Sequence, residues 1–363
     1  MSTRTDRTEG RATARSARSS TTTDPSVSPE VTVLLGDPSL PDGSKPGHRF
    51  TPEDLESIER VRAALGEVDD RTFHYITEHD QLIDRLRDAP PDLVLNFCDT
   101  GFRNDARREA HIAALLELLD IPYTGAGPTC LGLCYDKAAV RAIAADAGVP
   151  VPAEVLVEHG AAVEIDAGWP LPALIKPATG DGSVGITAAS VVHSTDAVRL
   201  RIAHLRSSLP GRDLLVQQYL TGDEYAIALI GNPADGFDVL PPLRVDYAAL
   251  PPDLPPILSY ESKTDPSSPY WTQIRYVAAD LDPDRRDALV RHAETLFRRL
   301  DCRDYARFDF RADTAGNIKL LEVNPNPAWC WDGKFNLMAG LAGWSYTRLL
   351  TQILRAAELR LER

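Results

Sequence analysis

The chain has 363 residues, of which 43% are hydrophobic and 25% are charged, and its formal net charge at pH 7 is −14. This length suggests two or three domains with substantial cores. The acidic balance argues against general binding of nucleic acid or anionic membranes, and no apolar run approaches the length of a membrane span.

The first 29 residues contain five arginines and three acids but almost no large apolar side chains. Such a segment buries too little surface to order itself, so we expect a disordered tail. It also lacks the apolar region of a secretory signal. The five cysteines are widely scattered and form neither a disulfide framework nor a zinc pattern. Free thiols are typical of a reducing compartment, which favours a cytoplasmic protein.

After the tail, short apolar strands alternate with helices. The predicted strands are residues 31–35, 73–76 and 92–97, and a helix is expected from Thr51, because Thr51 can cap it, a proline follows and acids fill its first turn. This alternation predicts a parallel α/β domain, in which ligands bind beyond the carboxyl ends of the strands. The loops at residues 36–40 and 98–105 are therefore expected beside the site.

In the middle of the chain, a predicted strand at residues 173–177 contains Lys176 and leads into a glycine-rich loop at residues 178–185. Glycines allow backbone amides to close on phosphates, and a nearby lysine supplies positive charge. The lysine precedes the loop, so this is not a P-loop, and an ordinary hairpin turn is the alternative. Residues 214–229 predict two strands around a polar turn. The apolar part of this segment could hold a purine between its backbone and side chains. The proline-rich residues 233–256 carry no strong pattern.

Near the C-terminus, two alternating runs separated by a turn-rich segment predict an antiparallel hairpin: residues 305–311 and 318–324. Arg307 and Asp309 share a face of the first strand, and Glu322 and Asn324 share a face of the second. The hairpin would place Asp309 near Glu322 and Asn324, a group of hard oxygen ligands of the kind that Mg²⁺ takes together with phosphate and water. A hairpin with a merely charged solvent face is the alternative interpretation.

Six motifs resemble, in this order, those of ATP-grasp ligases, and most closely the D-alanine–D-alanine ligase branch. They are Pro-Tyr-Thr-Gly at 122–125 with Asp-Lys at 136–137, Leu-Ile-Lys-Pro at 174–177 with its glycine loop, Val-Gln-Gln-Tyr-Leu-Thr-Gly-Asp-Glu at 216–224, Tyr-Glu-Ser-Lys at 260–263, Ala-Arg-Phe-Asp-Phe at 306–310, and Leu-Glu-Val-Asn at 321–324. Each motif is weak alone, so the resemblance rests on their order and spacing over residues 118–363.

The resemblance implies a three-domain ATP-grasp fold of the α/β class. The expected parts are a disordered tail at 1–29, an N-terminal parallel α/β domain at 30–127, a central α+β lid domain at 128–216, and a C-terminal α+β catalytic domain at 217–363. It also implies ATP between the last two domains. A homodimer is expected by analogy with the fold alone.

The resemblance further implies a role for each matching residue. The residues implied to bind ATP are Lys137 and Lys176 at the phosphates, Gly182, Ser183 and Val184 in the loop that closes over them, Gln217, Tyr219 and Leu220 at the adenine, Glu224 at the ribose, and Lys263 at the γ-phosphate. The implied metal ligands are Asp309, Glu322 and Asn324, which would hold two Mg²⁺ ions, or Mn²⁺ in their place. Arg307, with backbone amides near Ala328, would stabilise the tetrahedral oxyanion.

The implied reaction joins a small-molecule carboxylate to an amine. A carboxylate is a poor electrophile, so ATP phosphorylates it, the amine attacks the acyl phosphate, and ADP and phosphate are released. The protein would contribute mainly positioning and charge neutralisation.

Three loops depart from the pattern of D-alanine–D-alanine ligases. The first loop offers Asp37 where the family has a glutamate, and residues 96–105 replace the family's loop with His-Gly and Glu-Asp-Gly. Trp-Cys-Trp-Asp-Gly-Lys at 329–334 replaces a small serine-containing loop. The two tryptophans would either reshape the second-substrate pocket or pack in the core. The substrate-contact candidates are Asp37, Asp99, Arg103, Ala328 and Lys334.

We therefore expect a ligase that acts on amino acids other than D-alanine, in specialised metabolism. One alternative is a D-alanine–D-alanine ligase of peptidoglycan synthesis with divergent loops. Another is a catalytically silent ATP-binding regulatory protein, although such a protein has no need of Arg307 or of a complete set of metal ligands.

Overall fold

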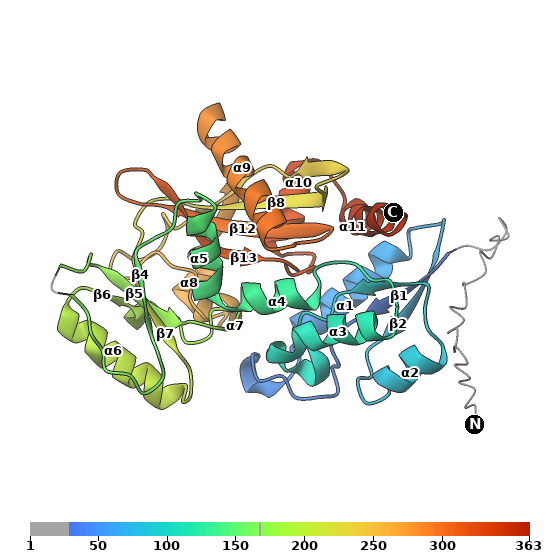
Figure 1. Ribbon diagram of the computed structural model, residues 1–363, viewed down its shortest axis with the longest axis horizontal. Coiled ribbons are helices and arrows are strands. Elements are labelled where there is room, and N and C mark those ends of the chain that lie inside the picture. The colour runs from blue at the N-terminus through green and yellow to red at the C-terminus, as the bar shows by residue number, and fades with distance from the viewer. Residues whose placement is uncertain (1–28, 167) are drawn as a thin grey trace, which may run out of the picture.

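The computed structural model of the protein describes residues 29–363 apart from residue 167. Figure 1 shows three units: an N-terminal unit in blue and cyan, a central unit in green and a C-terminal unit in yellow to red. The tail predicted at residues 1–29 lies outside the described residues except for Pro29. No helix in the part of the chain that is described has the length and hydrophobicity needed to cross a bilayer.

The N-terminal unit is a three-stranded parallel sheet in the order β2-β1-β3, as the alternation of strands and helices predicts. Its elements are β1 (Glu30–Leu34), η1 (Pro46–His48), α1 (Pro52–Leu65), β2 (Thr72–Ile76), α2 (Leu82–Asp88), β3 (Leu93–Asn96), η2 (Phe102–Asn104), η3 (Ala106–Arg108) and α3 (Glu109–Leu118). The predicted start of α1 is confirmed: Thr51 and Asp54 form a reciprocal capping box, and Pro52 occupies the first turn.

Two helices lead into the central unit, α4 (Pro128–Tyr135) and α5 (Lys137–Asp146). The central unit contains β4 (Glu154–Val157), β5 (Ala173–Pro177), η4 (Ala188–Ser190), β6 (Val191–Val192), α6 (Thr195–Ser208) and β7 (Leu214–Gln218). Its four strands form an antiparallel sheet in the order β4-β7-β5-β6. The predicted boundary between residues 216 and 217 is wrong, because it cuts β7, which pairs with β4 as far as Gln217 and with β5 as far as Gln218.

The C-terminal unit is built on an antiparallel sheet in the order β11-β10-β8-β12-β13, with β9 on β8. Its elements are β8 (Glu224–Asn232), β9 (Gly236–Val239), β10 (Leu243–Asp246), α7 (Glu261–Thr264), α8 (Pro269–Gln273), β11 (Arg275–Ala278), α9 (Pro283–Arg299), β12 (Tyr305–Ala312), β13 (Ile318–Asn324), α10 (Lys334–Leu341) and α11 (Tyr346–Leu361). Strands β9 and β10 lie in the proline-rich stretch where the sequence carries no strong pattern.

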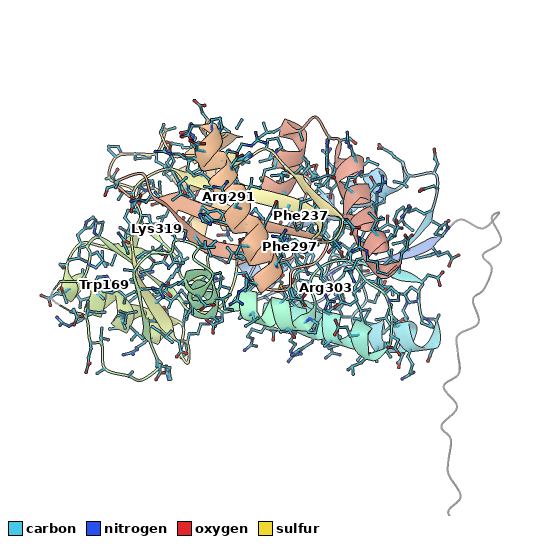
Figure 2. All side chains as sticks on the ribbon, turned by 45° about the horizontal axis from the view of Figure 1, so that its top comes forward. Trp169, Phe237, Arg291, Phe297, Arg303 and Lys319 are labelled. Atoms are coloured by element: carbon cyan, nitrogen blue, oxygen red, sulfur yellow. The ribbon has the colours of Figure 1, made fainter. Side chains whose placement is uncertain are left out.

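Both faces of strand β8 are buried, which explains its almost uninterrupted run of apolar residues. Tyr225, Ile227 and Leu229 pack into a core with α9, whereas the alternate alanines and Ile230 pack into a second core with α10 and α11. In Figure 2, Phe237 of β9 and Phe297 of α9 lie together, with their ring centroids 4.8 Å apart. The sheet is therefore held from both sides.

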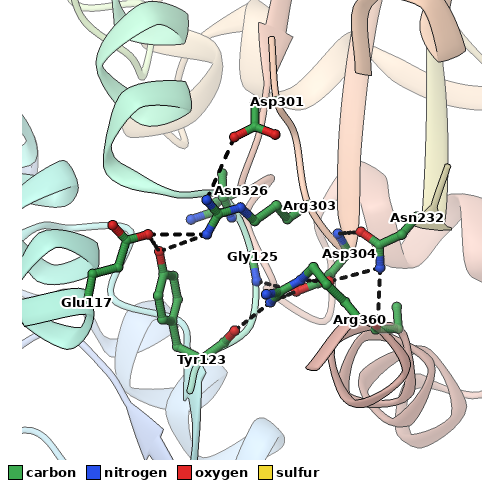
Figure 3. A network of polar contacts seen from close by, with 11 residues as sticks. Glu117, Tyr123, Gly125, Asn232, Asp301, Arg303, Asp304, Asn326 and Arg360 are labelled. Atoms are coloured by element: carbon green, nitrogen blue, oxygen red, sulfur yellow. Dashed lines mark hydrogen bonds and ion pairs between the residues drawn. The ribbon is translucent and has the colours of Figure 1, made fainter. Parts of the chain in front are cut away.

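A polar network joins the N-terminal and C-terminal units (Figure 3). The carboxylate of Asp304, which has no exposed surface, accepts hydrogen bonds from Arg360 Nε at 2.8 Å and Nη2 at 2.9 Å and from the Gly125 amide at 2.8 Å. Asn232 donates to the same carboxylate at 3.1 Å, and Arg360 also donates to the Tyr123 carbonyl. Because these partners come from four separate segments, the network stabilises the position of one unit against the other.

Candidate functional site

A cleft of about 1060 Å³ lies where the three units meet. It is lined by the loops after β1 and β3, the glycine-rich loop after β5, and one face of the β12–β13 hairpin. Every residue predicted from the sequence to contact ATP, metal or substrate lines this cleft except Asp37. The structure thus brings together residues that are up to 235 positions apart, from Asp99 to Lys334.

The hairpin supplies the acidic part of the cleft. In the register of β12 and β13, Asp309 lies opposite Glu322 and Arg307 lies opposite Asn324, so all four side chains share one face. Arg307 donates two hydrogen bonds to Asp309, from Nε at 2.9 Å and from Nη2 at 3.0 Å. Asn324 Nδ2 is 3.4 Å from the same carboxylate. The alternative of a merely solvent-facing charged surface is therefore wrong, since Asp309 is buried.

These residues are suited to holding a divalent cation. Burial would raise the pKa of Asp309, but Arg307 and Lys334 lower it to about 2, and the pKa of Glu322 is also lowered, because neighbouring cations such as Lys137 outweigh its burial. Both groups are thus carboxylates at neutral pH, as metal ligands must be. The described residues contain no cluster of three or more His, Cys, Asp and Glu side chains able to hold a metal. A cation at Asp309, Glu322 and Asn324 would need phosphate and water oxygens as well, as Mg²⁺ commonly does.

Lysines from separate segments converge on the same region. Lys137 Nζ donates to the Gly180 carbonyl and lies 3.9 Å from Glu322. Lys176 Nζ donates to Gln217 at 3.0 Å, and Gln217 Nε2 donates in turn to Glu154 at 2.6 Å. Burial, together with nearby positive charges, lowers the pKa of Lys176 and of Lys263. These cations repel one another in the absence of an anion, which makes the region favourable for phosphate.

The glycine-rich loop is anchored at both of its sides. Gly185 has φ of +79°, and a Cβ there would lie 2.7 Å from Leu209, so a glycine is needed at this turn. The buried Arg201 of α6 donates to the Gly185 carbonyl at 2.9 Å. Ser183 Oγ donates to the Leu258 carbonyl at 2.9 Å, which ties the loop to the C-terminal unit. The loop therefore closes one side of the cleft.

The region expected to hold the nucleoside contains two residues that the sequence motifs did not indicate. The guanidinium of Arg311 lies over the rings of Tyr219 and Tyr247, 5.2 and 5.4 Å from their centroids. Tyr247 donates to Glu224 at 2.7 Å, and Arg311 lies 3.6 Å from the same carboxylate. Arg311 shares the strand face of Arg307 and Asp309 and could have been found by that signal. Tyr247 follows β10 in the proline-rich stretch and carries no such signal.

The prediction for Asp37 is wrong. Its carboxylate is 4% exposed and accepts hydrogen bonds from the Ser39 amide, the Ser39 hydroxyl and the His79 amide. These bonds hold the loop together, so the Asp37 carboxylate stabilises the loop and does not line the cleft. Asp99 does line the cleft, and burial raises its pKa to about 6. Arg103 lines the rim, but its guanidinium pairs with Asp80.

The segment after the hairpin has a mixed role. Trp329 packs in the core: its ring stacks on Phe97 with centroids 5.4 Å apart, and its Nε1 donates to the Phe97 carbonyl at 2.8 Å. Trp331 instead lies beneath the Arg60 guanidinium, 4.4 Å from it. Burial raises the pKa of Cys330 to about 12, so its thiol is a poor nucleophile at neutral pH.

Lys334, a substrate-contact candidate, lines the cleft beside two carboxylates of the protein itself. Its Nζ lies 3.7 Å from Asp309 and 3.9 Å from Glu224, and it begins helix α10. This places Lys334 beside the residues expected to hold metal and nucleotide. Ala328 lines the cleft as predicted.

The sequence model of the family described as "D-ala D-ala ligase C-terminus" matches residues 144–355. Among relatives, the "Uncharacterized protein y4sG" of Sinorhizobium fredii is 30% identical over 308 residues, which are 83% of this chain and 87% of that protein. A "D-alanine--D-alanine ligase" of Haemophilus influenzae is 28% identical over 245 residues, 66% of this chain and 76% of that protein.

Solved structures share the fold. The D-alanine--D-alanine ligase of Bacillus anthracis complexed with ATP superposes with a TM-score of 0.68 at 20% identity, over 92% of this chain and 98% of that one. The VanG D-Ala:D-Ser ligase of Enterococcus faecalis superposes with a TM-score of 0.67 at 18% identity, over 91% and 99% of the two chains. The three-unit arrangement is therefore the ATP-grasp fold that the sequence motifs predict.

Proposed function

Because the chain belongs to the D-ala D-ala ligase C-terminus family, we propose that it is an ATP-dependent ligase that joins a small-molecule carboxylate to an amine. One observation carries the proposal. A single cleft contains the paired Arg307 and Asp309, the opposing Glu322, and lysines from three other segments. A protein that only bound a nucleotide would gain nothing from a buried arginine facing the metal ligands.

The proposed reaction has two steps. A carboxylate oxygen of the first substrate attacks the γ-phosphorus of ATP, the bond from that phosphorus to the ADP oxygen breaks, and an acyl phosphate forms. The amine of the second substrate then attacks the acyl carbon, loses a proton, and expels inorganic phosphate as the C–N bond forms. The products are an amide, ADP, phosphate and one proton.

The side chains in the cleft are suited to charge neutralisation and positioning. Lys137, Lys176 and Lys263 would hold the phosphates, and the loop of Ser183 would exclude water from them. Arg307 would stabilise the negative charge that develops on the acyl oxygen. Mg²⁺ at Asp309, Glu322 and Asn324 would offset the charge of the phosphate oxygens.

We propose that the substrates are amino acids other than D-alanine, as in specialised metabolism. The segment 329–334 stands where the family has a serine-containing loop, and Trp329, which lines the cleft, is fixed in place by its contacts with Phe97. The second candidate is a D-alanine–D-alanine ligase, which the names of several relatives favour.

The test is to incubate the protein with ATP, Mg²⁺ and pools of amino acids, and to measure ADP and phosphate release together with amide formation by mass spectrometry. Release that depends on one pool, with a new amide of matching mass, is the expected result. Release with D-alanine alone would instead support the second candidate. ATP binding without release in any pool would refute the ligase.

A further inference from the structure

The wall of the cleft formed by the N-terminal unit is rich in carboxylates. Asp42 lies in the loop after β1, Asp54 in the first turn of α1, and Asp99 in the loop after β3, and all three line the cleft together with Lys45. We refer to these four residues as the acidic wall. Hydroxyl groups of Ser44, Ser57 and Thr100 line the cleft beside it.

Only one of the three carboxylates in the acidic wall has a cation of its own. Lys45 Nζ lies 2.6 Å from Asp54 Oδ1, and the other oxygen of Asp54 accepts from the Thr51 amide at 2.7 Å. Among the described residues, neither Asp42 nor Asp99 has a basic side chain within 4.0 Å. The formal charge of the acidic wall is therefore −2 when all four groups are ionised.

Asp42 has an unused acceptor. Its Oδ1 accepts from the amide and the hydroxyl of Ser44, at 2.9 and 2.6 Å. Its Oδ2 is buried, since the residue is only 2% exposed, and this oxygen has no hydrogen-bond partner in the described part of the chain. A buried carboxylate oxygen without a donor is unfavourable, and a ligand that supplies an N–H would remove that cost.

The acidic wall borders the cation-rich part of the cleft. Tyr260 donates from its hydroxyl to the Ser44 carbonyl at 3.0 Å, in the same loop as Asp42. Three residues later, Lys263 of helix α7 lines the region expected to hold the phosphates. The acidic wall and the region expected to hold the phosphates therefore line the same cleft, next to each other.

The acidic wall is suited to an organic cation. The ring of Phe50, which also lines the cleft, already carries the Lys45 ammonium 5.0 Å from its centroid. Acceptors, hydroxyls and an aromatic ring together are the surroundings that bind ammonium groups.

We propose that the acidic wall selects a diamino acid, whose two ammonium groups neutralise Asp42 and Asp99. A monoamino acid supplies one positive charge and leaves one of these carboxylates uncompensated, whereas a diamino acid supplies two. Burial raises the pKa of Asp99 in the free protein, although the charge of Lys45 opposes this, and a bound ammonium would lower the pKa further. This inference rests on the proposed ligase and names its substrate class.

The experiment compares lysine, ornithine, 2,4-diaminobutyrate and 2,3-diaminopropionate with neutral analogues that lack the second amine, norleucine for lysine and alanine for diaminopropionate. ADP release is measured at fixed ATP and Mg²⁺, with a constant mixture of amine acceptors. We expect kcat/KM for at least one diamino acid to exceed that of its neutral analogue by about 10²-fold, the scale set by leaving a buried polar group unpaired.

Two isosteric variants locate the effect, Asp42→Asn and Asp99→Asn, with Asp69→Asn on the exposed surface as the matched control. We expect each cleft variant to lower the preference for the diamino acid without changing the KM for ATP, and the control to keep it. If a cleft variant fails to fold, the proposal is tested by the native protein alone, through the ratio of kcat/KM for the diamino acid to kcat/KM for its neutral analogue. ADP release with neutral amino acids only would overturn this inference and leave the ligase intact. No release with any pool would overturn both.

Discussion

Replacing Arg307 by alanine removes a buried cation from the centre of the cleft. The side chains of Arg307 and Asp309 are 13% and 5% exposed, and two hydrogen bonds of 2.9 and 3.0 Å join them. If Arg307 stabilises the oxyanion, we expect kcat to fall by about 10²–10³-fold, equivalent to about 2.7–4 kcal/mol of transition-state stabilisation.

The same change has a structural cost that must be separated from the catalytic one. Removing one partner of a buried ion pair destabilises a protein by about 3–5 kcal/mol. Lys334 Nζ stays 3.7 Å from Asp309, so part of the carboxylate charge remains compensated. We therefore expect the free energy of unfolding to fall by about 3 kcal/mol. The variant should therefore remain folded at 25 °C in the absence of denaturant.

The assay measures steady-state ADP release, KM for ATP and urea unfolding of Arg307→Ala beside Arg307→Lys. The lysine variant keeps the charge but cannot form the two parallel hydrogen bonds, so its kcat should lie between those of alanine and arginine. A folded alanine variant with wild-type turnover would refute the reasoning. A change in KM alone would assign Arg307 to ground-state binding.

Three further predictions concern stability and metal dependence. Burial raises the pKa of Asp99 from 3.8 to about 6, so its contribution to stability is fully present below pH 3.8 and is lost as the pH rises through 6. Asp99→Asn should thus gain up to about 3 kcal/mol relative to the wild type between pH 4 and pH 7.5 in urea unfolding, and a pH-independent difference would contradict this. Asp304→Ala should lower the free energy of unfolding by about 3–5 kcal/mol, because Arg360 loses its buried partner. The control is Asp301→Ala, because the carboxylate of Asp301 is largely exposed. Equal effects of the two substitutions would contradict the role of the network. Chelation by EDTA should abolish ADP release, and excess Mg²⁺ or Mn²⁺ should restore it, whereas activity that persists in EDTA would exclude a metal at Asp309 and Glu322.

Much of the fold and of the site could be predicted because its signals are local. Alternation with a period of two indicated the hairpin that aligns Asp309 with Glu322, and the structure confirms that register. The cap of α1 was readable from Thr51 and Pro52 alone. Lys176 and the glycine-rich loop were recognisable because a strand, a lysine and several glycines follow one another directly.

The roles of the carboxylates in the loop after β1 could not be predicted from local sequence. It contains Asp37 and Asp42, and nothing in their neighbouring residues distinguishes a carboxylate that holds the loop together from one that faces the cleft. The structure assigns Asp37 to the first role, through Ser39 and His79, and leaves an oxygen of Asp42 without a partner. The two carboxylates differ because of the path that the backbone of the loop takes. That path depends on hydrogen bonds with Asn104 and Tyr260 from distant segments.

The sequence by itself therefore determined the β12–β13 hairpin, the strands of the N-terminal unit and the start of α1, and through its ordered motifs the family and the fold. Tertiary structure alone decided the contacts between distant segments: Arg311 with Tyr247 and Glu224, Lys334 with Asp309, and Asp304 with Arg360. The physical reason is that periodicity and turn chemistry act over a few residues, whereas charge pairs such as these form only when packing of the whole chain brings their segments together.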